Sequence, residues 1–457
     1  MEELLILGIG ISEHKTDGAN RFEYFCQKFK LSYKIVGEGE KWLGGDMAMG
    51  PGGGHKINAI RNELLNMENK LIVICDTFDL FPVASSKEII NKYHQLSPQN
   101  QIICTSEVYC WPRKDLQQLY QTAYPNIQTK YRYLNSGGII GYSSDILSII
   151  KDGTSDTEDD QLFYTLKYLT TDKIILDTSC QIFQAIEGSY DDIRIHKNRI
   201  YNSFTNSYPI FIHGNGWAKI FLNRLENYLE LDVGKDYSEK NCLKENPSIF
   251  YSVHIDSSKP IVLTEFFKHF NLIKWNNFVC YVYDMGNNYE LVSLVCAVQF
   301  VYRPNISSYT YDDFIQSKCD YYFLLEKQCM ITNENIIKDL LPMFNSYRRI
   351  ISPLLIKNTN NLFSNFWGEL GERNGYYKRS VDYIDMLERK IRGNFNVPYV
   401  SGAVLFKREM IENFDLNREN KYSDNNIDMA LAMNLRRETL FMYMCNEYEW
   451  GYLIEIE

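Results

Sequence analysis

Short apolar runs alternate with amphipathic segments along most of the chain. The first run, Leu4 to Ser12, predicts a buried strand, and aromatic residues at positions 22, 25 and 29 then fall on one helical face. A second strand is predicted over Ser32 to Val36. This order predicts a βαβ opening whose first turn is a plausible nucleotide site. Its glycines do not form GxGxxG, so the dinucleotide fingerprint is absent.

The run from Leu71 to Asp79 carries the strongest local signal. Five apolar residues lead directly into Asp76 and Asp79. A continuous run of this kind predicts a strand buried on both faces of an α/β sheet, and ligands of such sheets bind beyond the carboxyl ends of strands. Two carboxylates there suit Mg²⁺ or Mn²⁺ holding a diphosphate. From this stretch alone, a polar turn that caps the strand remains the alternative.

Further elements are predicted up to about position 142. Helices are expected from about Ile57 to Met67 and from Ser86 to Leu96, and another buried strand from Gln101 to Glu107. The Asn-Ser-Gly-Gly sequence at 135–138 predicts a turn into a strand whose backbone another group approaches closely.

Three polar features accompany these elements. A glycine-rich stretch, residues 37–56, delivers Lys56 near a helix start, where it could approach phosphates, although it is not a P-loop and could be a lid without a ligand. An acidic run, Asp156 to Asp160, suits a helix N-terminus. His213 ends an apolar run before a glycine-flanked turn, where it is either a ligand or simply hydrogen-bonded.

Residues 233–247 are charged and polar without an apolar period, which is typical of a linker. A second α/β series is predicted after it, with strands at Ile261–Leu263, Phe278–Tyr283, Tyr321–Leu325 and Ile350–Leu355. After Leu325 the chain continues Glu-Lys-Gln, without the carboxylate pair of the first half. We therefore predict that the second domain binds no catalytic metal and acts as a scaffold or acceptor platform.

The amino-acid composition limits the class of protein but does not indicate an activity. With 457 residues and 45% hydrophobic content, the chain can form two to four folded domains, and a net charge of -10 argues against a broad nucleic-acid surface. Aromatic residues make up 14%, with more Tyr (34) than Phe (25), which is compatible with a sugar site. The 11 cysteines include no CxxC pair and no zinc spacing, so buried reduced thiols are expected.

The N-terminus has no basic start and no long apolar stretch, and no uninterrupted apolar span of about 20 residues occurs elsewhere. The sequence as written thus predicts a soluble, cytoplasmic protein without a membrane partner.

Seven motifs occur in the order and approximate spacing of one known domain. They are Trp42-Leu43-Gly44-Gly45-Asp46, the Gly52-Gly53-Gly54 turn with Lys56, the Asp76/Asp79 pair, Cys110-Trp111-Pro112, Leu134 to Tyr142, Asp159 to Tyr164, and His213-Gly214-Asn215-Gly216. Residues 4–230 thereby resemble the N-terminal glycosyltransferase region of the multifunctional procollagen lysyl hydroxylases.

The second half resembles the accessory domain of the same proteins. Its carriers are Asn365 to Gly368, Tyr376 to Ser380 with Asp382-Tyr383, Asn396 to Ser401, and Asp428-Met429-Ala430. The iron-dependent hydroxylase domain of that family has no counterpart in this sequence. We therefore expect a stand-alone glycosyltransferase that does not hydroxylate lysine.

The resemblance implies an α/β protein with two tandem GT-A (Rossmann-like) domains, the second degenerate and non-catalytic. The expected bounds are 1–235 and 250–457, with a linker over 236–249. The implied activity is Mn²⁺-dependent transfer of glucose from UDP-glucose to galactosyl-hydroxylysine of collagen or a collagen-like peptide, with retention of configuration. A homodimer is a further expectation, weakened by the missing hydroxylase domain, and no nucleic-acid partner is expected.

Site residues follow from the matching motif positions. The resemblance implies Mn²⁺ ligands at Asp76, Asp79 and His213, and an acidic catalytic pair at the sugar, Asp159 and Asp160. The remaining positions implied to bind the donor are Trp42, Lys56, Phe78 (near the uracil), Asn135, Gln161, Asn215 and Lys219. Glu13 and His14 depart from the small or hydroxyl residues usual after the first strand, where uracil contacts are made.

Two other functions remain open from the sequence. One is a galactosyltransferase that acts on hydroxylysine itself, and the other is an inactive module that binds sugar or collagen. Offering UDP-glucose and UDP-galactose with both acceptor peptides would separate them.

Overall fold

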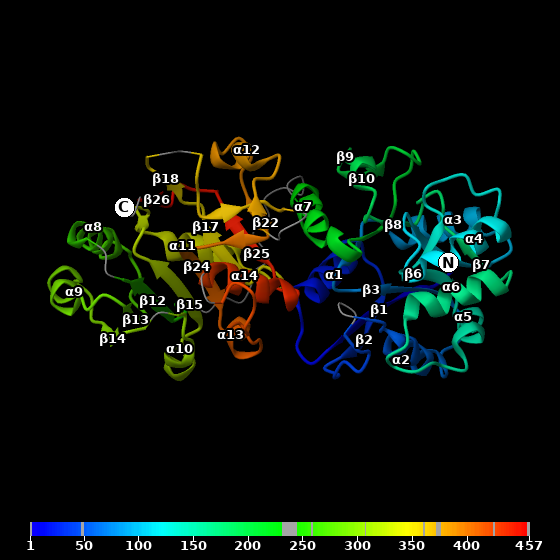
Figure 1. Cartoon of the computed structure of the whole chain (residues 1–457), viewed down its shortest axis with the longest axis horizontal. Coiled ribbons are helices and arrows are strands. Elements are labelled where there is room, and N and C mark those ends of the chain that lie inside the picture. Colours follow the sequence, from blue (N-terminus) through cyan, green and yellow to red (C-terminus); the bar gives the residue numbers. More distant parts are fainter. Residues whose placement is uncertain are drawn as a thin grey trace. The chain divides into compact units, whose positions relative to one another are not determined.

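The computed structural model describes residues 2–46, 50–230, 245–256, 259–306, 308–359, 362–371, 376–423 and 426–454. The chain divides into two compact units, unit 1 (Met1–Leu229) and unit 2 (Glu230–Glu457) (Figure 1). Most of the expected linker, 236–249, lies outside the described residues, and Ile249 is the first residue of a strand of unit 2.

Unit 1 is built on a six-stranded sheet in the order β2-β1-β3-β6-β5-β7. The strands are β1 (Leu4–Ser12), β2 (Tyr33–Glu38), β3 (Leu71–Asp76), β5 (Ile102–Glu107), β6 (Tyr133–Tyr142) and β7 (Ile174–Leu176). β1 is parallel to both β2 and β3, whereas β6 is antiparallel to β3 and β5. Asp76 and Glu107, at the ends of β3 and β5, thus lie on either side of the first residues of β6.

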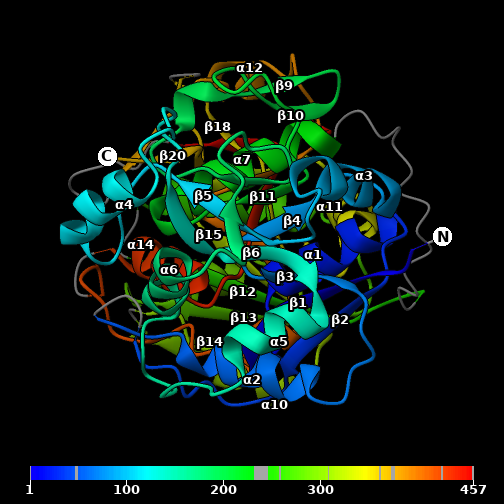
Figure 2. The ribbon, with the colours of Figure 1, turned by 90° about the vertical axis from the view of Figure 1, so that its right-hand side faces the viewer.

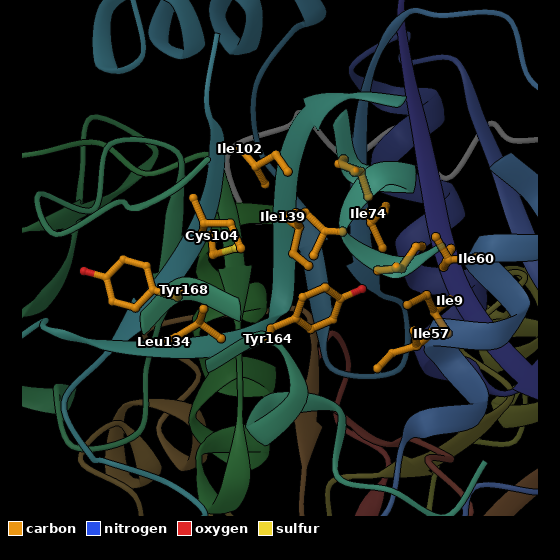
Figure 3. Close-up of a cluster of buried hydrophobic side chains, with 14 of the residues drawn as sticks. Ile9, Ile57, Ile60, Ile74, Ile102, Cys104, Leu134, Ile139, Tyr164 and Tyr168 are labelled. Carbon is orange, nitrogen blue, oxygen red and sulfur yellow. The ribbon is translucent and has the colours of Figure 1, made fainter. Parts of the chain in front are cut away.

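Both faces of this sheet are covered by helices (Figures 1 and 2). The helices of unit 1 are α1 (Asp17–Lys28), α2 (Gly54–Leu64), α3 (Ser86–Leu96), α4 (Gln117–Ala123), α5 (Ser143–Ile150), α6 (Asp160–Thr170) and α7 (Lys219–Glu230). Ile72 and Ile74 of β3 pack with α2, α4, α5 and α6, and Figure 3 shows part of this cluster. Val73 and Cys75 pack with α1 and α3 on the other face. The two-sided burial predicted for this strand is confirmed.

This core fixes the end of β3 in space. Ile72, Val73 and Ile74 are each at most 2% exposed. Complete burial of such a side chain contributes about 1.5–3 kcal/mol before the entropy of ordering the chain is counted. The carboxylate that follows is therefore presented by a rigid strand and not by a loop.

A second, three-stranded sheet in the order β4-β11-β8 extends the same edge. Its strands are β4 (Leu80–Pro82), β8 (Phe183–Ala185) and β11 (Phe211–His213). His213 pairs with Leu80 across the antiparallel β4–β11 ladder, and the Gly214 N–H donates to the Asp79 carbonyl oxygen at 2.8 Å. Positions 79 and 213, far apart in sequence, are thereby fixed side by side.

Unit 2 repeats the plan with an eight-stranded sheet in the order β14-β13-β12-β15-β24-β17-β25-β22. These strands are β12 (Ile249–Ile255), β13 (Phe278–Asp284), β14 (Val301–Pro304), β15 (Tyr321–Glu326), β17 (Ile350–Pro353), β22 (Asn394–Val397), β24 (Ala403–Lys407) and β25 (Met442–Cys445). A small sheet, β16 (Cys329–Ile331), β26 (Gly451–Leu453) and β18 (Ile356–Lys357), corresponds to the small sheet of unit 1.

The helices of unit 2 connect these strands. They are α8 (Pro260–Phe270), α9 (Tyr289–Val295), α10 (Asp312–Ser317), α11 (Ile336–Leu340), α12 (Tyr383–Leu387), α13 (Glu409–Glu412) and α14 (Ile427–Arg437). Three short strand pairings, β9 (Ile193–His196) with β10 (Arg199–Asn202), β19 (Phe366–Trp367) with β23 (Tyr399–Val400), and β20 (Glu369–Leu370) with β21 (Tyr377–Lys378), complete the strands of the structure.

Three predictions about individual elements are wrong. Residues 261–263 are not a strand but part of α8, because Pro260 suits the first helical turn and Leu263, Phe266 and Phe270 form one buried face. Residues 135–138 are not a turn but lie inside β6. The helix predicted to begin at Ile57 begins at Gly54, so Lys56 lies in its first turn.

No helix in the described parts of the chain is long and apolar enough to cross a membrane. The ten cysteines among those residues are all buried and unpaired, as the sequence predicts.

Candidate active site

Three potential metal ligands meet where β3 and β11 end. Asp76, Asp79 and His213 each offer one ligand atom, and these atoms lie within 4.8 Å of one another. The Nε2 atom of His213 is 3.9 Å from Asp76 Oδ2 and 3.5 Å from Asp79 Oδ1. Two carboxylates and an imidazole are a donor set that suits Mn²⁺, since its softer character tolerates nitrogen better than Mg²⁺ does.

The imidazole of His213 is oriented by a neighbouring amide. Its Nδ1 atom lies 3.1 Å from Asn135 Oδ1, and the same oxygen accepts the Gly137 N–H at 3.0 Å. Because this oxygen is an acceptor, Nδ1 of His213 carries the proton and donates it. Nε2 is thereby left facing the two aspartates, where a bound metal ion would take its lone pair.

Gly137 allows the ring to lie there. A Cβ atom at this position would be 2.2 Å from His213 Cε1 and 2.6 Å from Nδ1. The close approach predicted for residues 135–138 is therefore real, and the approaching group is this imidazole.

Two lysines neutralise the carboxylates. Lys56 Nζ is 2.8 Å from Asp76 Oδ1 and 3.8 Å from Asp160 Oδ2, and Lys219 Nζ is 3.0 Å from Asp79 Oδ2. Burial alone would lower the pKa of Lys56, but the three aspartates around it raise the pKa above its ordinary value. The charge of Asp79 is the main reason that the pKa of Lys219 is also raised.

Asp79 is ionised across the usual pH range. Burial works to raise the pKa of this carboxyl, but the charges and hydrogen bonds of Lys219 and His213 outweigh it and hold the pKa well below its ordinary value. A carboxylate that stays charged in a half-buried position is suited to binding a cation.

The acidic run predicted at a helix start lies beside these lysines. Asp159 is the N-cap of α6, and its Oδ1 accepts the Leu162 N–H at 2.7 Å. Burial is the main factor raising the pKa of Asp159. Asp160, the first residue of the helix, faces Lys56 instead. The two carboxylates therefore differ in role: one caps the helix, and the other faces the site.

The glycine-rich stretch is joined to this helix start. Gly53 forms a β-bridge with Asp159, and the Asp160 N–H donates to Gly52 O at 3.3 Å. The first amides of α2 are already used, since Gly54 N–H donates to Glu158 O at 2.8 Å and His55 N–H to Asp156 O at 2.9 Å. Lys56 remains the group of this turn that can meet a phosphate. Residues 47–49, within the predicted lid, lie outside the described residues.

Gly53 provides a test of this junction. Its φ is +107°, and a Cβ atom would lie 2.4 Å from Asp160 Oδ1. We expect Gly53→Ala to lower the free energy of unfolding by about 1–3 kcal/mol and to reduce transfer activity, because the backbone is strained and Asp160 is displaced. Thermal unfolding and turnover would be compared with Gly50→Ala, whose added Cβ meets nothing within 4 Å. Equal behaviour of the two variants would contradict the expectation.

Sequence reasoning missed the buried carboxylate at the centre of the remaining polar residues. Glu107 ends β5 and is 4% exposed. Its Oε1 accepts Gln161 Nε2 at 2.6 Å and Asn135 Nδ2 at 3.4 Å, and its Oε2 accepts Asn215 Nδ2 at 2.9 Å. Burial raises the pKa of Glu107 to about 7. The sequence held one signal for this residue: Glu107 ends a predicted strand, on the same sheet edge as Asp76.

The structure places the two aromatic candidates differently. Phe78 lies in the turn between Asp76 and Asp79, and its backbone packs against Gly18 of α1, where an added Cβ would lie 2.2 Å from Phe78 O. Trp42 contacts the glycine-rich stretch: its Nε1 donates to Gly45 O at 2.6 Å, and its ring lies 5.6 Å from that of His55. Trp42 is thus connected through His55 to α2, the helix that carries Lys56.

Unit 2 has the corresponding strand end without the metal group. The Thr77 N–H donates to Ile9 O at 3.2 Å in unit 1, and the Lys327 N–H donates to His254 O at the same distance in unit 2. Glu326 is therefore the counterpart of Asp76. The turn after it is one residue shorter, and the Ile454 N–H donates to Gln328 O at 3.1 Å as the Gly214 N–H does to Asp79 O, so Gln328 takes the place of Asp79.

The third ligand is also replaced. His213 pairs with Leu80, the first residue of β4, in unit 1, and Leu453 pairs with Cys329, the first residue of β16, in unit 2. Within the ranges given above, the one group of His, Cys, Asp and Glu side chains able to hold a metal ion is that of unit 1.

In unit 2, a tyrosine hydroxyl bridges the carboxylates of Glu326 and Asp428, whereas lysines pair with the carboxylates of unit 1. Tyr309 donates to Glu326 Oε1 at 2.5 Å and also contacts Asp428, which lies in the first turn of α14. Burial, together with Glu326, raises the pKa of Asp428 to about 8. Tyr309 brings no positive charge to this acid pair, whereas Lys56 and Lys219 bring two to the carboxylates of unit 1.

A Rossmann-like α/β unit with aspartates and histidine at the carboxyl edge of its sheet, followed by a second unit of the same plan, has the GT-A fold of glycosyltransferases. The family model of the PLOD GT domain matches residues 1–240, and that of the glycosyltransferase family 25 N-terminal domain matches residues 311–456. The chain belongs to the family of the PLOD glycosyltransferase domain, which confirms the resemblance drawn from its motifs.

Individual relatives match this chain over different shares of their own length. The uncharacterized protein R699 of Acanthamoeba polyphaga mimivirus is 43% identical, over 99% of this chain and 98% of its own. The human multifunctional procollagen lysine hydroxylase and glycosyltransferase LH3 is 29% identical over 99% of this chain, which spans 65% of LH3. Among solved structures, the mannosyltransferase PcManGT of Pyrobaculum calidifontis covers 52% of this chain and 66% of its own, with 12% identity and a TM-score of 0.31.

Proposed function

We propose that the protein is a Mn²⁺-dependent glucosyltransferase that moves glucose from UDP-glucose to galactosyl-hydroxylysine of collagen or a collagen-like peptide. The observation that carries this proposal is the meeting of Asp76, Asp79 and His213 at one sheet edge, with Asp160 reached through Lys56. Membership of the PLOD glycosyltransferase family, and the similarity to LH3, support the donor and acceptor.

Asp76, Asp79 and Nε2 of His213 would hold the metal. When bound, Mn²⁺ supplies positive charge to the diphosphate that leaves with the nucleotide. Lys56 and Lys219 can each turn from an aspartate to a phosphate oxygen, because a lysine stem is long and flexible. These two ammonium groups then stabilise the negative charge that develops as the sugar bond breaks.

Asp160 would act at the transferred sugar. It lies at the start of α6 and near Lys56, and its carboxylate is not consumed by a helix cap, as that of Asp159 is. Such a group can stabilise the oxocarbenium-like state or orient the acceptor hydroxyl, as expected for transfer with retention. Asn135, Gln161 and Asn215 contribute through their common bonds to Glu107.

Unit 2 would serve as a scaffold or acceptor platform. The replacement of Asp79 and His213 by Gln328 and Leu453 removes the charged oxygen ligand and the imidazole. A tightly bound Mn²⁺ ion in unit 2 would contradict this part of the proposal.

A matrix of two donors and two acceptors tests the function. UDP-glucose and UDP-galactose would each be offered with hydroxylysine and galactosyl-hydroxylysine peptides, with Mn²⁺ and after its removal by a chelator. We expect transfer with UDP-glucose and the galactosylated peptide, lost on chelation and restored by Mn²⁺. Transfer from UDP-galactose to hydroxylysine would instead show a galactosyltransferase, and binding without product an inactive module.

A further inference from the structure

Trp217 is the most exposed aromatic side chain in the part of the chain that the structure describes, at 89% of full exposure. It lies in the 3₁₀ turn η3 (Gly216–Ala218), between His213 at the end of β11 and Lys219 at the start of α7. The side chains of His213 and Lys219 both lie close to the Asp79 carboxylate. A large ring left in water contributes little to the fold, whereas beside a ligand site it offers contact area.

The backbone that carries this ring is fixed. The Trp217 N–H donates to Glu187 Oε2 at 3.1 Å, and the Tyr190 hydroxyl donates to the same oxygen at 2.6 Å. The Glu187 N–H in turn donates to Asn215 Oδ1 at 3.0 Å. Because the turn is held on both sides, only the side-chain torsions of Trp217 have to be ordered when a ligand binds, which keeps the entropic penalty small.

A second exposed ring lies beside the same segment. Tyr109 is 53% exposed, and its ring lies against Gly188, where an added Cβ would be 2.7 Å away from it. Gly188 directly follows Glu187, the anchor of the Trp217 backbone. Two exposed aromatic side chains thus flank residues 187–188, whereas Lys56 approaches the carboxylates from a different element, α2.

This arrangement suits a sugar ring. One face of a galactose ring is a patch of C–H groups, while its hydroxyls lie around the rim and prefer water or polar partners. An exposed indole can cover the apolar face without removing the hydroxyls from water, and the large rigid ring gives contact area at low entropic penalty. A donor held by its diphosphate does not need such a surface, but a sugar on an incoming acceptor does.

We propose that Trp217, with Tyr109 beside it, is the stacking site for the sugar that the acceptor already carries. This inference rests on the proposed function and adds to it the surface that distinguishes a glycosylated acceptor from a bare one. Trp217 acts here as a specificity residue: it contacts the acceptor sugar and takes no part in holding the metal or the nucleotide.

The test is Trp217→Ala in the full chain, with steady-state kinetics varied in each substrate. We expect KM for the galactosyl-hydroxylysine peptide to rise about tenfold or more, since truncation of a buried Trp contact commonly has this effect. KM for UDP-glucose should stay within about twofold, and Trp217→Phe should recover most of the loss. Leu65→Ala, at a 52% exposed position directly after α2 in unit 1, is the control and should change neither constant.

Equilibrium binding separates this inference from the proposed function. The stacking site can be tested even if the wild type gives no product. The galactosyl-hydroxylysine peptide and its unglycosylated form would each be titrated into wild type and Trp217→Ala. Tighter binding of the glycosylated peptide that is lost in the variant supports the stacking site. Equal affinity for the two peptides, or an unchanged affinity or KM in the variant, overturns it, whichever donor the enzyme uses.

Discussion

Asp79→Ala should abolish sugar transfer and leave the fold intact. The variant removes the carboxylate that lies within reach of both His213 and Lys219, so one of three ligands is lost and the metal is held weakly. We expect the rate of transfer from UDP-glucose to fall at least about 10³-fold, corresponding to roughly 4 kcal/mol of transition-state stabilisation. The backbone bond from Gly214 to Asp79 O does not depend on this side chain and should keep the strand junction in place.

Metal titration and thermal unfolding check that result. The wild type should bind one Mn²⁺ ion per chain, and Asp79→Ala should bind none at the same concentration, with cooperative unfolding in both. Asp152→Ala, which removes an exposed carboxylate elsewhere in unit 1, is the control and should bind Mn²⁺ normally. Normal turnover in Asp79→Ala would refute the metal assignment, and a retained ion would place the metal elsewhere in the chain.

Glu107→Gln should reduce transfer by roughly 10- to 100-fold, the usual effect of removing a partner that orients ligands. All three side-chain groups around Glu107 are amide NH₂ donors. A glutamine can accept on one atom but presents its own NH₂ on the other. One of Gln161 and Asn215 must then lose its acceptor and move, and the amides that line the site move with it.

The same substitution should change the pH dependence of stability. Because the pKa of Glu107 is raised to about 7 in the folded protein, the stability that this group contributes is fully present below about pH 4.5 and is lost as pH rises toward 7. Relative to Glu107→Gln, the unfolding free energy of the wild type should therefore decline across that interval, by on the order of 3 kcal/mol at most.

Denaturant unfolding between pH 4.5 and 8 measures this difference. Glu226→Gln is the matched control, since Glu226 is a carboxylate of similar burial that pairs with Arg21 at 2.8 Å, away from the site. The control should lose stability without the loss of turnover per folded molecule. A constant difference between wild type and Glu107→Gln over this pH range would show that Glu107 titrates normally.

Local patterns in the sequence were sufficient to predict those parts of the site that lie on a single strand or helix. The run before Asp76 is apolar at every position, and burial on both faces follows from that. The acidic run before α6 and the position of His213 at a strand end also follow from neighbouring residues. That these elements meet at one edge came from the family resemblance, not from the local patterns.

What the sequence did not disclose depends on partners far apart in the chain. Glu107 is one carboxylate among many until Asn135, Gln161 and Asn215 converge on it. Residues 261–263 were misassigned because three β-branched or branched apolar residues look like a strand when Pro260 and the helical spacing after them are ignored. The turn expected at 135–138 failed for a similar reason, since glycine there serves the His213 ring and not a change of direction.

The two lysines beside the aspartates have a consequence for the charge balance of a catalytic cycle. Asp76, Asp79 and Asp160 together with Lys56 and Lys219 leave this group with one excess negative charge. A divalent cation would turn that into one positive charge, and the doubly charged bridge of a nucleotide diphosphate would return it to one negative. The site therefore stays within one unit of neutrality as the metal and the donor bind, and the further negative charge formed on the diphosphate when the sugar leaves arises beside Lys56 and Lys219.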